Sequence, residues 1–174
     1  SIRSTRSRRC CPGTSPHQRG LASLPEPHRV KPAKPRRPHD AYKRLHIPVQ
    51  LIQAQAEALP LSDHVFDTIV TTWTLCTISE VDKALAELRR ALKPTGQLLF
   101  LEHGRAEDYA VSRWQDALTH LTRPLNGGCR INRSIADLLT KAGFEILSLR
   151  TGYAGVIKPF VYIYEGCASP TGTD

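Results

Sequence analysis

Two polar residues at the end of an apolar run are the first candidates for chemistry. The stretch "GQLLFLEHG" is typical of a buried strand, and it ends in Glu102 and His103, which neither a strand nor a turn requires. Histidine can take a proton from a reacting group near neutral pH. We therefore predict His103 as a general base and Glu102 as a ligand contact. The alternative for His103 is a hydrogen-bonded histidine at the sheet edge without a catalytic part.

The two tryptophans and the cysteines allow both functional and structural interpretations. Trp73 and Trp114 could contact a ligand or pack at the edge of the core. The five cysteines are odd in number and form no C-x-x-C pair. This argues against a disulfide framework or a structural zinc site and favours a reducing compartment, here the cytoplasm. We therefore predict no metal site, and we interpret Cys76 and Cys129 as small buried side chains.

Strands alternate with helices in the second part of the chain. β-Branched residues in "FDTIVTTWTL" (66–75) predict a strand, and "PVQLIQA" (48–54) alternates like a shorter one. Helical spacing of apolar residues predicts helices over 79–92, 107–125 and 134–144. Two further strands, "FEILSLRTGY" and "FVYIYEGCA", follow closely enough to form an antiparallel pair.

Capping residues mark two of these helices. Ser79 and Asp82 have the spacing of a capping box, and Lys93-Pro94 ends that helix. Ser134 and Asp137 have the same spacing at the start of the helix over 134–144, and Gly143 suits the left-handed residue after its end.

The order strand, helix, strand, helix, strand predicts an α/β fold with a parallel sheet covered on both faces. Ligands bind such sheets where the carboxyl ends of the strands open into loops. Thr72 and Trp73 end one predicted strand, and Glu102 and His103 end the next. We expect these four residues to lie side by side at one edge of the sheet.

Residues 1–44 differ from the rest in charge and in proline content. They carry twelve Lys and Arg residues against Glu26 and Asp40, so they account for the net charge of +8. Closely spaced prolines and few apolar residues predict a disordered leader. We assign 1–44 to this leader, 45–168 to the folded domain and 169–174 to a tail. A basic leader could bind nucleic acid or anionic lipid, but its arginine-rich stretches 3–9 and 29–37 contain no aromatic residue to stack on bases.

The folded part resembles the second half of a class I S-adenosylmethionine-dependent methyltransferase of the type 11 domain. The pieces that carry the resemblance are "AEALP", "FDTIV", "LKPTG" and "LEHG", in the family's order. "GGCRINRSIADLLTKAGFEI" and the late "YIYEG" are similar to the methyltransferase-like, thiol-methylating branch and its bacterial relatives. The match covers about residues 47 to 168 and implies strands 3 to 7 of a Rossmann-like doubly wound sheet.

The resemblance implies a cofactor, S-adenosyl-L-methionine, and residues that hold it. Gln55 stands where the family has an acidic residue near the adenine ring, and Ala56 follows it. The side-chain oxygen of Gln55 can still accept from the adenine amino group. Thr72 and Trp73 match the loop that packs near the methionine and adenosine parts of the cofactor.

The resemblance also implies a small-molecule methyl acceptor, with a thiol as one candidate. Glu102 and His103 match the strand end on the acceptor side, and Trp114, Asn126 and Asn132 fall in the segment that shapes the acceptor pocket in relatives. No run of eighteen apolar residues exists to cross a membrane, which leaves peripheral membrane contact open.

The family's glycine-rich loop, G-x-G-x-G, has no counterpart here. Gly13 and Gly20 are isolated, and no apolar strand precedes either. We therefore expect a truncated methyltransferase that lacks its first strand and this loop and has reduced or no activity. The alternative function is a non-catalytic fragment whose basic leader binds nucleic acid or anionic membrane.

Overall fold

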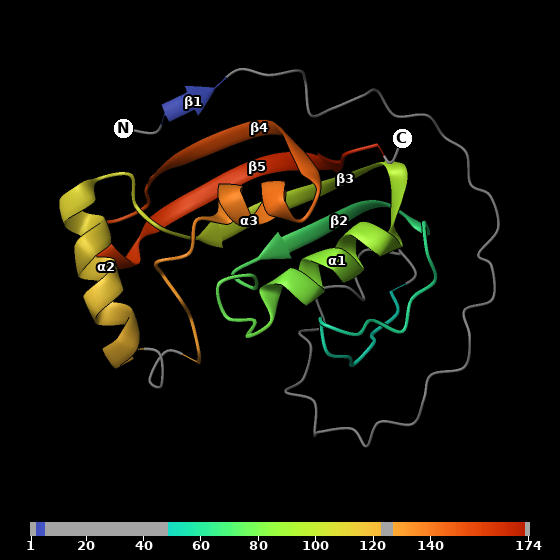
Figure 1. The fold of residues 1–174 in the computed structure, drawn as a ribbon, viewed down its shortest axis with the longest axis horizontal. Coiled ribbons are helices and arrows are strands. Elements are labelled where there is room, and N and C mark those ends of the chain that lie inside the picture. The colour runs from blue at the N-terminus through green and yellow to red at the C-terminus, as the bar shows by residue number, and fades with distance from the viewer. Residues whose placement is uncertain (1–2, 6–48, 123–126, 173–174) are drawn as a thin grey trace.

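A computed structural model describes residues 3–5, 49–122 and 127–172 of the chain (Figure 1). The helices are α1 (Val81–Ala91), α2 (Tyr109–Thr122) and α3 (Ile135–Lys141), with a 3-10 turn η2 (Lys158–Phe160). The strands are β1 (Arg3–Thr5), β2 (Phe66–Thr72), β3 (Leu92–His103), β4 (Phe144–Tyr153) and β5 (Tyr162–Pro170).

The strands form one mixed sheet in the order β1-β4-β5-β3-β2. β2 and β3 are parallel, with Ile69 opposite Leu98 and Thr72 opposite Leu101. β5 runs antiparallel to both β3 and β4. The predicted antiparallel pair at the end of the chain is therefore confirmed, and the carboxyl ends of β2 and β3 meet at one edge of the sheet.

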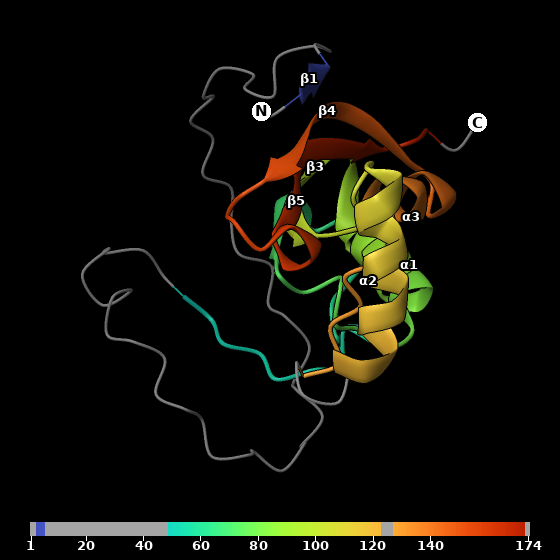
Figure 2. The ribbon, with the colours of Figure 1, turned by 90° about the vertical axis from the view of Figure 1, so that its left-hand side faces the viewer.

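The three helices lie on the same side of this sheet (Figure 2). Val81 and Leu85 of α1 and Ile135 and Leu139 of α3 join one buried cluster with strand residues such as Phe100. Within the described residues no helix covers the other face, where the side chain of Val70 is 64% exposed. The prediction of a sheet covered on both faces is therefore met on one face only.

Residues 49–54 do not form the strand that their alternating pattern predicted. Leu51 is 65% exposed and Ile52 is 45% exposed, and no strand of the described sheet pairs with this segment. A strand needs a partner for its backbone groups and a face to bury, so alternation alone was not sufficient.

Of the two predicted helix caps, the one at α3 forms and the one at α1 does not. α1 begins after Glu80 without a side-chain cap, so the predicted capping box of Ser79 and Asp82 does not form. At α3 the Ser134 hydroxyl accepts from the Asp137 N–H at 3.4 Å, as predicted. Gly143 follows α3 with φ at +80°, the left-handed conformation expected there.

The Lys-Pro-Thr-Gly stretch becomes a bulge inside β3 instead of a separate turn. Pairing with β2 passes from Phe66–Leu92 to Thr68–Gln97, so residues 93–96 have no partners across the ladder. Pro94 is tolerated here because its missing N–H lies in this irregular part of the pairing.

Three residues of the predicted leader belong to the sheet, since β1 pairs with β4. Residues 6–48 lie outside the described residues, and with them most of the predicted leader. None of the helices in the described part of the chain is long and apolar enough to cross a membrane.

Candidate functional site

Trp73 and His103 touch at the edge where β2 and β3 end. The Trp73 N–H donates to the carbonyl of Leu101 at 3.0 Å, which extends the ladder by one bond beyond Thr72. Trp73 has φ at +53°, a conformation uncommon for a bulky residue, and this ends the strand. Its ring meets the His103 ring edge-on, with ring centroids 3.8 Å apart. Strained backbone of this kind is concentrated at functional sites.

Glu102 points to the helix side of the sheet and is fully buried. Its Oε2 accepts from the N–H groups of Thr74 at 2.9 Å and Leu75 at 3.1 Å. Burial raises the pKa of this carboxyl, and the two backbone donors partly oppose that shift. Glu102 is thus placed to hold the loop after β2.

Thr72 lies on the open face of the sheet, where its side chain is exposed. It lines a hollow with residues of all four long strands, among them Leu101, Arg150 and Cys167. The Thr72 carbonyl accepts from the Thr74 hydroxyl at 2.8 Å. Thr72 and Trp73 are therefore adjacent at the edge, as the sequence predicted for these two positions.

Gln55 and Ala56 lie in an irregular segment beside α1. Gln55 is exposed and forms an isolated bridge with Ala58. The segment is held to the helix because the Leu59 N–H donates to Glu87 Oε2 at 2.9 Å. No hydrogen bond or ring contact of the described residues joins Gln55 or Ala56 to Trp73.

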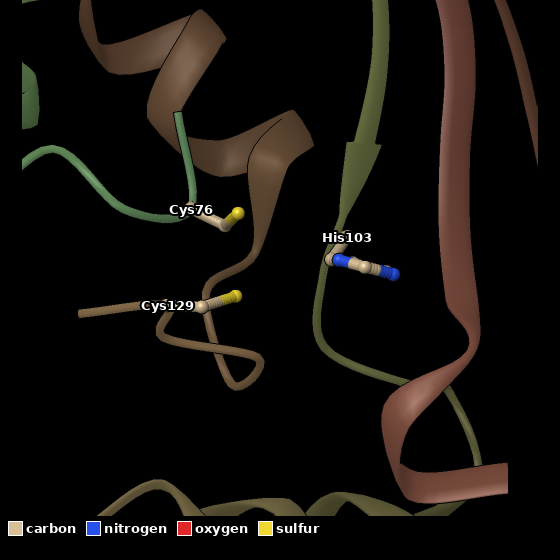
Figure 3. Close-up of side chains that lie close together, drawn as sticks. All are labelled: Cys76, His103 and Cys129. Carbon is tan, nitrogen blue, oxygen red and sulfur yellow. The ribbon is translucent and has the colours of Figure 1, made fainter. Parts of the chain in front are cut away.

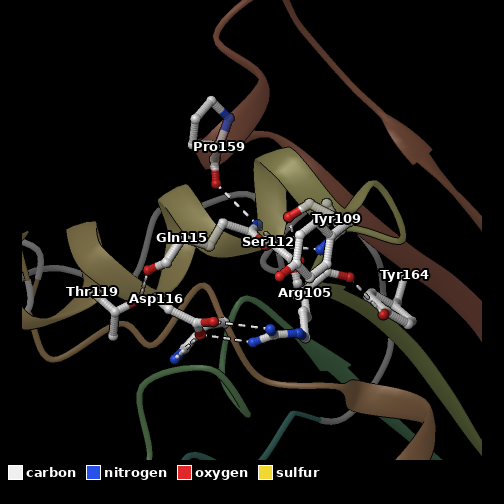
Figure 4. A network of polar contacts seen from close by, with 11 residues as sticks. Arg105, Tyr109, Ser112, Gln115, Asp116, Thr119, Pro159 and Tyr164 are labelled. Carbon is white, nitrogen blue, oxygen red and sulfur yellow. Dashed lines mark hydrogen bonds and ion pairs between the residues drawn. The ribbon is translucent and has the colours of Figure 1, made fainter.

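Trp114 and Asn132 occupy different environments on and beside α2. Trp114 is 65% exposed on the outer side of that helix. Asn132 donates to Asp116 Oδ1 at 3.0 Å, and Asp116 also receives two hydrogen bonds from Arg105, at 2.7 and 2.9 Å (Figure 4). Asn126, the third predicted acceptor contact from this part of the sequence, lies outside the described residues.

A fully buried amide attaches α2 to the segment after β3. Gln115 Oε1 accepts from the Ala106 N–H at 2.8 Å, and Gln115 Nε2 donates to the carbonyls of Gly104 and Pro159, both at 3.0 Å (Figure 4). The Tyr164 hydroxyl donates to the Arg105 carbonyl at 2.7 Å. These bonds fix the backbone that follows His103.

A polar hollow lies near the start of β5. Glu107, Asp108, Tyr109, Thr151, Tyr153 and Tyr162 line it. The carbonyl of Tyr162 accepts from the Gly104 N–H at 3.1 Å, so this hollow borders the chain segment directly after His103. No local sequence pattern groups these residues, because the hollow is assembled from three separate segments.

Cys76, His103 and Cys129 converge at the same edge (Figure 3). One ligand atom from each lies within 4.8 Å of the other two. A hydrogen bond with Cys76 and the neighbouring His103 lower the pKa of Cys129 to about 5. The hydrogen bond with Cys129 and burial raise the pKa of Cys76. Sequence reasoning missed this cluster because its members are far apart in the chain and form no local motif.

The sequence matches a family model described as a methyltransferase domain over residues 25–100. The match begins inside the segment predicted as leader. It contains β2, Trp73, α1 and most of β3. It ends just before Glu102 and His103.

Curated relatives share moderate identity with part of the chain. The ubiquinone/menaquinone biosynthesis C-methyltransferase UbiE of Marinomonas sp. (strain MWYL1) is 29% identical over 136 residues, which are 68% of this chain and 53% of the relative. The UbiE of Escherichia coli (strain K12 / DH10B) is 32% identical over 127 residues, 63% of this chain and 51% of the relative. The chain spans about half the length of these relatives.

Solved structures share the fold at low sequence identity. The YcgJ protein from Bacillus subtilis superposes with a TM-score of 0.58 at 16% identity, over 76% of both chains. An S-adenosylmethionine-dependent methyltransferase from Methanosarcina mazei gives 0.54 at 20% identity, over 69% of this chain and 66% of that one. The solved structures confirm the predicted fold class. The family model and the curated relatives confirm the resemblance to methyltransferases.

Proposed function

We propose that this chain, a class I S-adenosylmethionine-dependent methyltransferase by its sequence family and fold, provides one side of the pocket in which a methyl group passes to a small-molecule acceptor. The observation that carries the proposal is the parallel pair β2 and β3, whose carboxyl ends place Trp73 against His103. Ligands of open α/β sheets bind at this end of the strands.

Trp73 is the residue that we assign to cofactor contact with most support. Its ring is 46% exposed although His103 packs against it. A half-exposed aromatic ring held by a strained backbone offers an apolar surface for an adenine ring or a methionine chain. Thr72, Gln55 and Ala56 remain further proposed contacts, with the Gln55 amide suited to the adenine amino group.

S-adenosylmethionine supplies a methyl group on a positively charged sulfur, which is already a good leaving group. The protein therefore mainly has to align the acceptor and exclude water. Glu102 contributes indirectly in this proposal, because its buried carboxylate positions the loop that carries Trp73 and Thr74. Its predicted contact with the acceptor stays a proposal.

The acceptor side is formed by His103 and the polar hollow beside it. His103 is half-buried and can take a proton from an acceptor held at the edge of the sheet. A thiol acceptor would benefit most, since the thiolate is the nucleophilic form. The hollow lined by Glu107, Tyr153 and Tyr162 supplies hydrogen-bonding groups for the rest of such a molecule. Trp114, Asn126 and Asn132 remain proposed acceptor contacts.

We further propose that the chain by itself binds the cofactor weakly and is slow or inactive in methyl transfer. The sequence contains no G-x-G-x-G stretch, the element that approaches the cofactor backbone most closely in this family. A reducing compartment such as the cytoplasm is the proposed setting, because the cysteines lack the pattern of a disulfide framework.

Calorimetric titration of the full chain with S-adenosylhomocysteine tests this function. We expect saturable binding that weakens at least about tenfold in Trp73→Ala, which corresponds to 1.4 kcal/mol. Trp114→Ala is the matched control, because Trp114 is similarly exposed but lies on the outer side of α2. Absence of binding by a folded chain would contradict the proposal. Salt-sensitive binding to duplex DNA in its place would favour the non-catalytic alternative.

A further inference from the structure

Three side chains that can bind a metal ion lie close together, although each comes from a different segment. Cys76 lies in the loop after β2, His103 ends β3, and Cys129 precedes α3 (Figure 3). Both sulfur atoms are on the sides of the cysteines that face His103. Among the described residues this is the one group of three potential metal ligands. The geometry points to a binding site for a thiophilic divalent cation, Zn²⁺ or a metal of similar chemistry, formed by Cys76, His103 and Cys129.

The spacing of the donor atoms suits such an ion after a small adjustment. Zinc binds cysteine sulfur at about 2.3 Å, so two sulfurs on a tetrahedral ion lie roughly 3.8 Å apart. The three donor atoms here are within 4.8 Å of one another. The donor atoms would therefore have to approach one another by about 1 Å or slightly more, and His103 and Cys129 are both partly exposed, which leaves an ion a way in.

The backbone around the three ligands is already fixed. The Arg130 N–H donates to the Cys76 carbonyl at 2.8 Å and so ties the two cysteine loops together. The guanidinium of Arg133 donates to the Leu75 carbonyl, which joins the same two loops a second time. Glu102 also fixes the loop that carries Cys76, because its Oε2 accepts from the N–H of Leu75. Partners of this kind orient metal ligands and strengthen binding.

The donor set selects the class of metal. Two thiolates and an imidazole suit zinc and similar thiophilic ions, whereas Mg²⁺ and Ca²⁺ prefer oxygen ligands. Three protein ligands leave the fourth tetrahedral position to water or another small ligand, the pattern of zinc sites that are not closed. The ion would connect the loop after β2, the end of β3 and the loop before α3.

This inference stands independently of the proposed methyl transfer. A histidine that ligates an ion through the nitrogen facing the cysteines cannot use that nitrogen as a base. Metal binding and the base role of His103 are therefore alternative states of one side chain. The metal test below measures binding alone, so a negative calorimetric result with S-adenosylhomocysteine would not affect it.

The first experiment uses cobalt(II) as a spectroscopic probe of the reduced, metal-free full chain. We expect one equivalent to produce a thiolate-to-cobalt charge-transfer band in the near ultraviolet, which Zn²⁺ then abolishes. Cys129→Ser and His103→Ala should each weaken Co²⁺ binding at least tenfold. Cys167→Ala, a change of a buried cysteine on β5, is the matched control and should retain the band.

The leader cysteines require their own control. The double change Cys10→Ser and Cys11→Ser should leave the band intact. Loss of the band in that variant, its persistence in Cys129→Ser, or its absence from the wild-type chain would each overturn the proposal.

X-ray absorption of the one-zinc chain keeps the test decisive even if a ligand variant fails to fold. The measurement is made on the chain that lacks the two leader cysteines. Two sulfur ligands at about 2.3 Å and at least one nitrogen ligand at about 2.0 Å are expected. A shell of oxygen and nitrogen alone would refute the site.

Discussion

The carboxylate of Glu102 is bound to the backbone of Leu75, across two neighbouring segments of the sheet edge. Glu102 Oε2 lies 3.1 Å from the Leu75 nitrogen and 2.9 Å from that of Thr74, and both Glu102 and Leu75 are fully buried. One side chain at the end of β3 thus fixes the loop that leads from Trp73 to Cys76. Loop and strand end form one unit, on which the proposed cofactor contact and the proposed metal site both depend.

Replacing Glu102 should show how strongly this unit depends on its acceptor oxygens. Glu102→Ala leaves two backbone N–H groups without their acceptor, and we expect a loss of about 2–4 kcal/mol in the free energy of unfolding. Glu102→Gln retains one acceptor oxygen and should lose less than half of that amount. Urea denaturation at pH 7 measures both values.

Glu145→Gln is the control for the Glu102 variants, because Glu145 is exposed on β4. It should change the free energy of unfolding by less than about 0.5 kcal/mol. Equal stability of Glu102→Ala and the wild-type chain would show that the loop does not depend on this carboxylate.

The docking of α2 should depend on Gln115 more than on any surface contact of that helix. Gln115→Ala removes three hydrogen bonds and leaves the Ala106 N–H without its acceptor, so we expect a loss of about 2–4 kcal/mol. Thr119→Ala serves as comparison, since it removes a single bond within the helix. Its cost should stay near 1 kcal/mol or less. Similar costs for the two variants, by urea denaturation, would contradict this view of the interface.

The polar attachments of α2 were not predictable from the sequence, although the helix was. Apolar spacing predicted a helix over 107–125, and α2 forms at Tyr109–Thr122. Its buried side chains are polar, namely Ser112, Gln115 and Thr119, while Trp114 is exposed. Because Gln115 is polar, the pattern predicts that its side chain lies at the surface. Its burial follows from where Gly104 and Pro159 present their carbonyls, which only the folded chain determines.

The ion pair between Arg105 and Asp116 should contribute modestly. It is bidentate, but the side chains are 38% and 44% exposed. A double-mutant cycle with Arg105→Ala and Asp116→Ala is expected to give a coupling energy of about 0.5–1 kcal/mol that decreases in high salt. Asn132 also donates to Asp116. Asn132→Ala should lower the free energy of unfolding by less than Arg105→Ala or Asp116→Ala, because the ion pair between Asp116 and Arg105 remains. A coupling energy of zero would indicate that the pair only fills space.

The attachment to α1 of the segment that carries Gln55 and Ala56 should weaken in acid. Hydrogen bonds from Arg90, together with the Leu59 N–H, lower the pKa of Glu87. Because the folded state depresses this pKa, its stabilising contribution is present above the unfolded value of about 4.3 and is lost as pH falls through the folded pKa. Glu87→Gln should therefore cost about 1 kcal/mol at pH 7 and progressively less below pH 4.

Urea denaturation across this pH range measures that difference. Glu80→Gln is the control, because the Glu80–Lys83 pair is exposed on both sides and should contribute little at any pH. A cost of Glu87→Gln that stays constant down to pH 3 would contradict the role assigned to this carboxylate.

Where β2 and β3 end was easier to predict from the sequence than which side chains meet there. β3 ends at His103 as predicted, whereas β2 ends at Thr72, directly before Trp73 and three residues earlier than the predicted strand over 66–75. The failed strand over 48–54 had the right alternation but gained no partner. The meeting of Cys76 with Cys129 depends on the Arg130–Cys76 backbone bond between distant loops, which no local pattern encodes.

We propose that the edge formed by β2 and β3 binds the nucleoside cofactor. Amide resonances of the ¹⁵N-labelled full chain, followed during titration with S-adenosylhomocysteine, test this most directly. We expect saturable shifts for Thr72, Trp73 and His103, while the amides around Trp114 stay unchanged. Shifts confined to residues away from this edge, or none up to the solubility limit of the ligand, would contradict it.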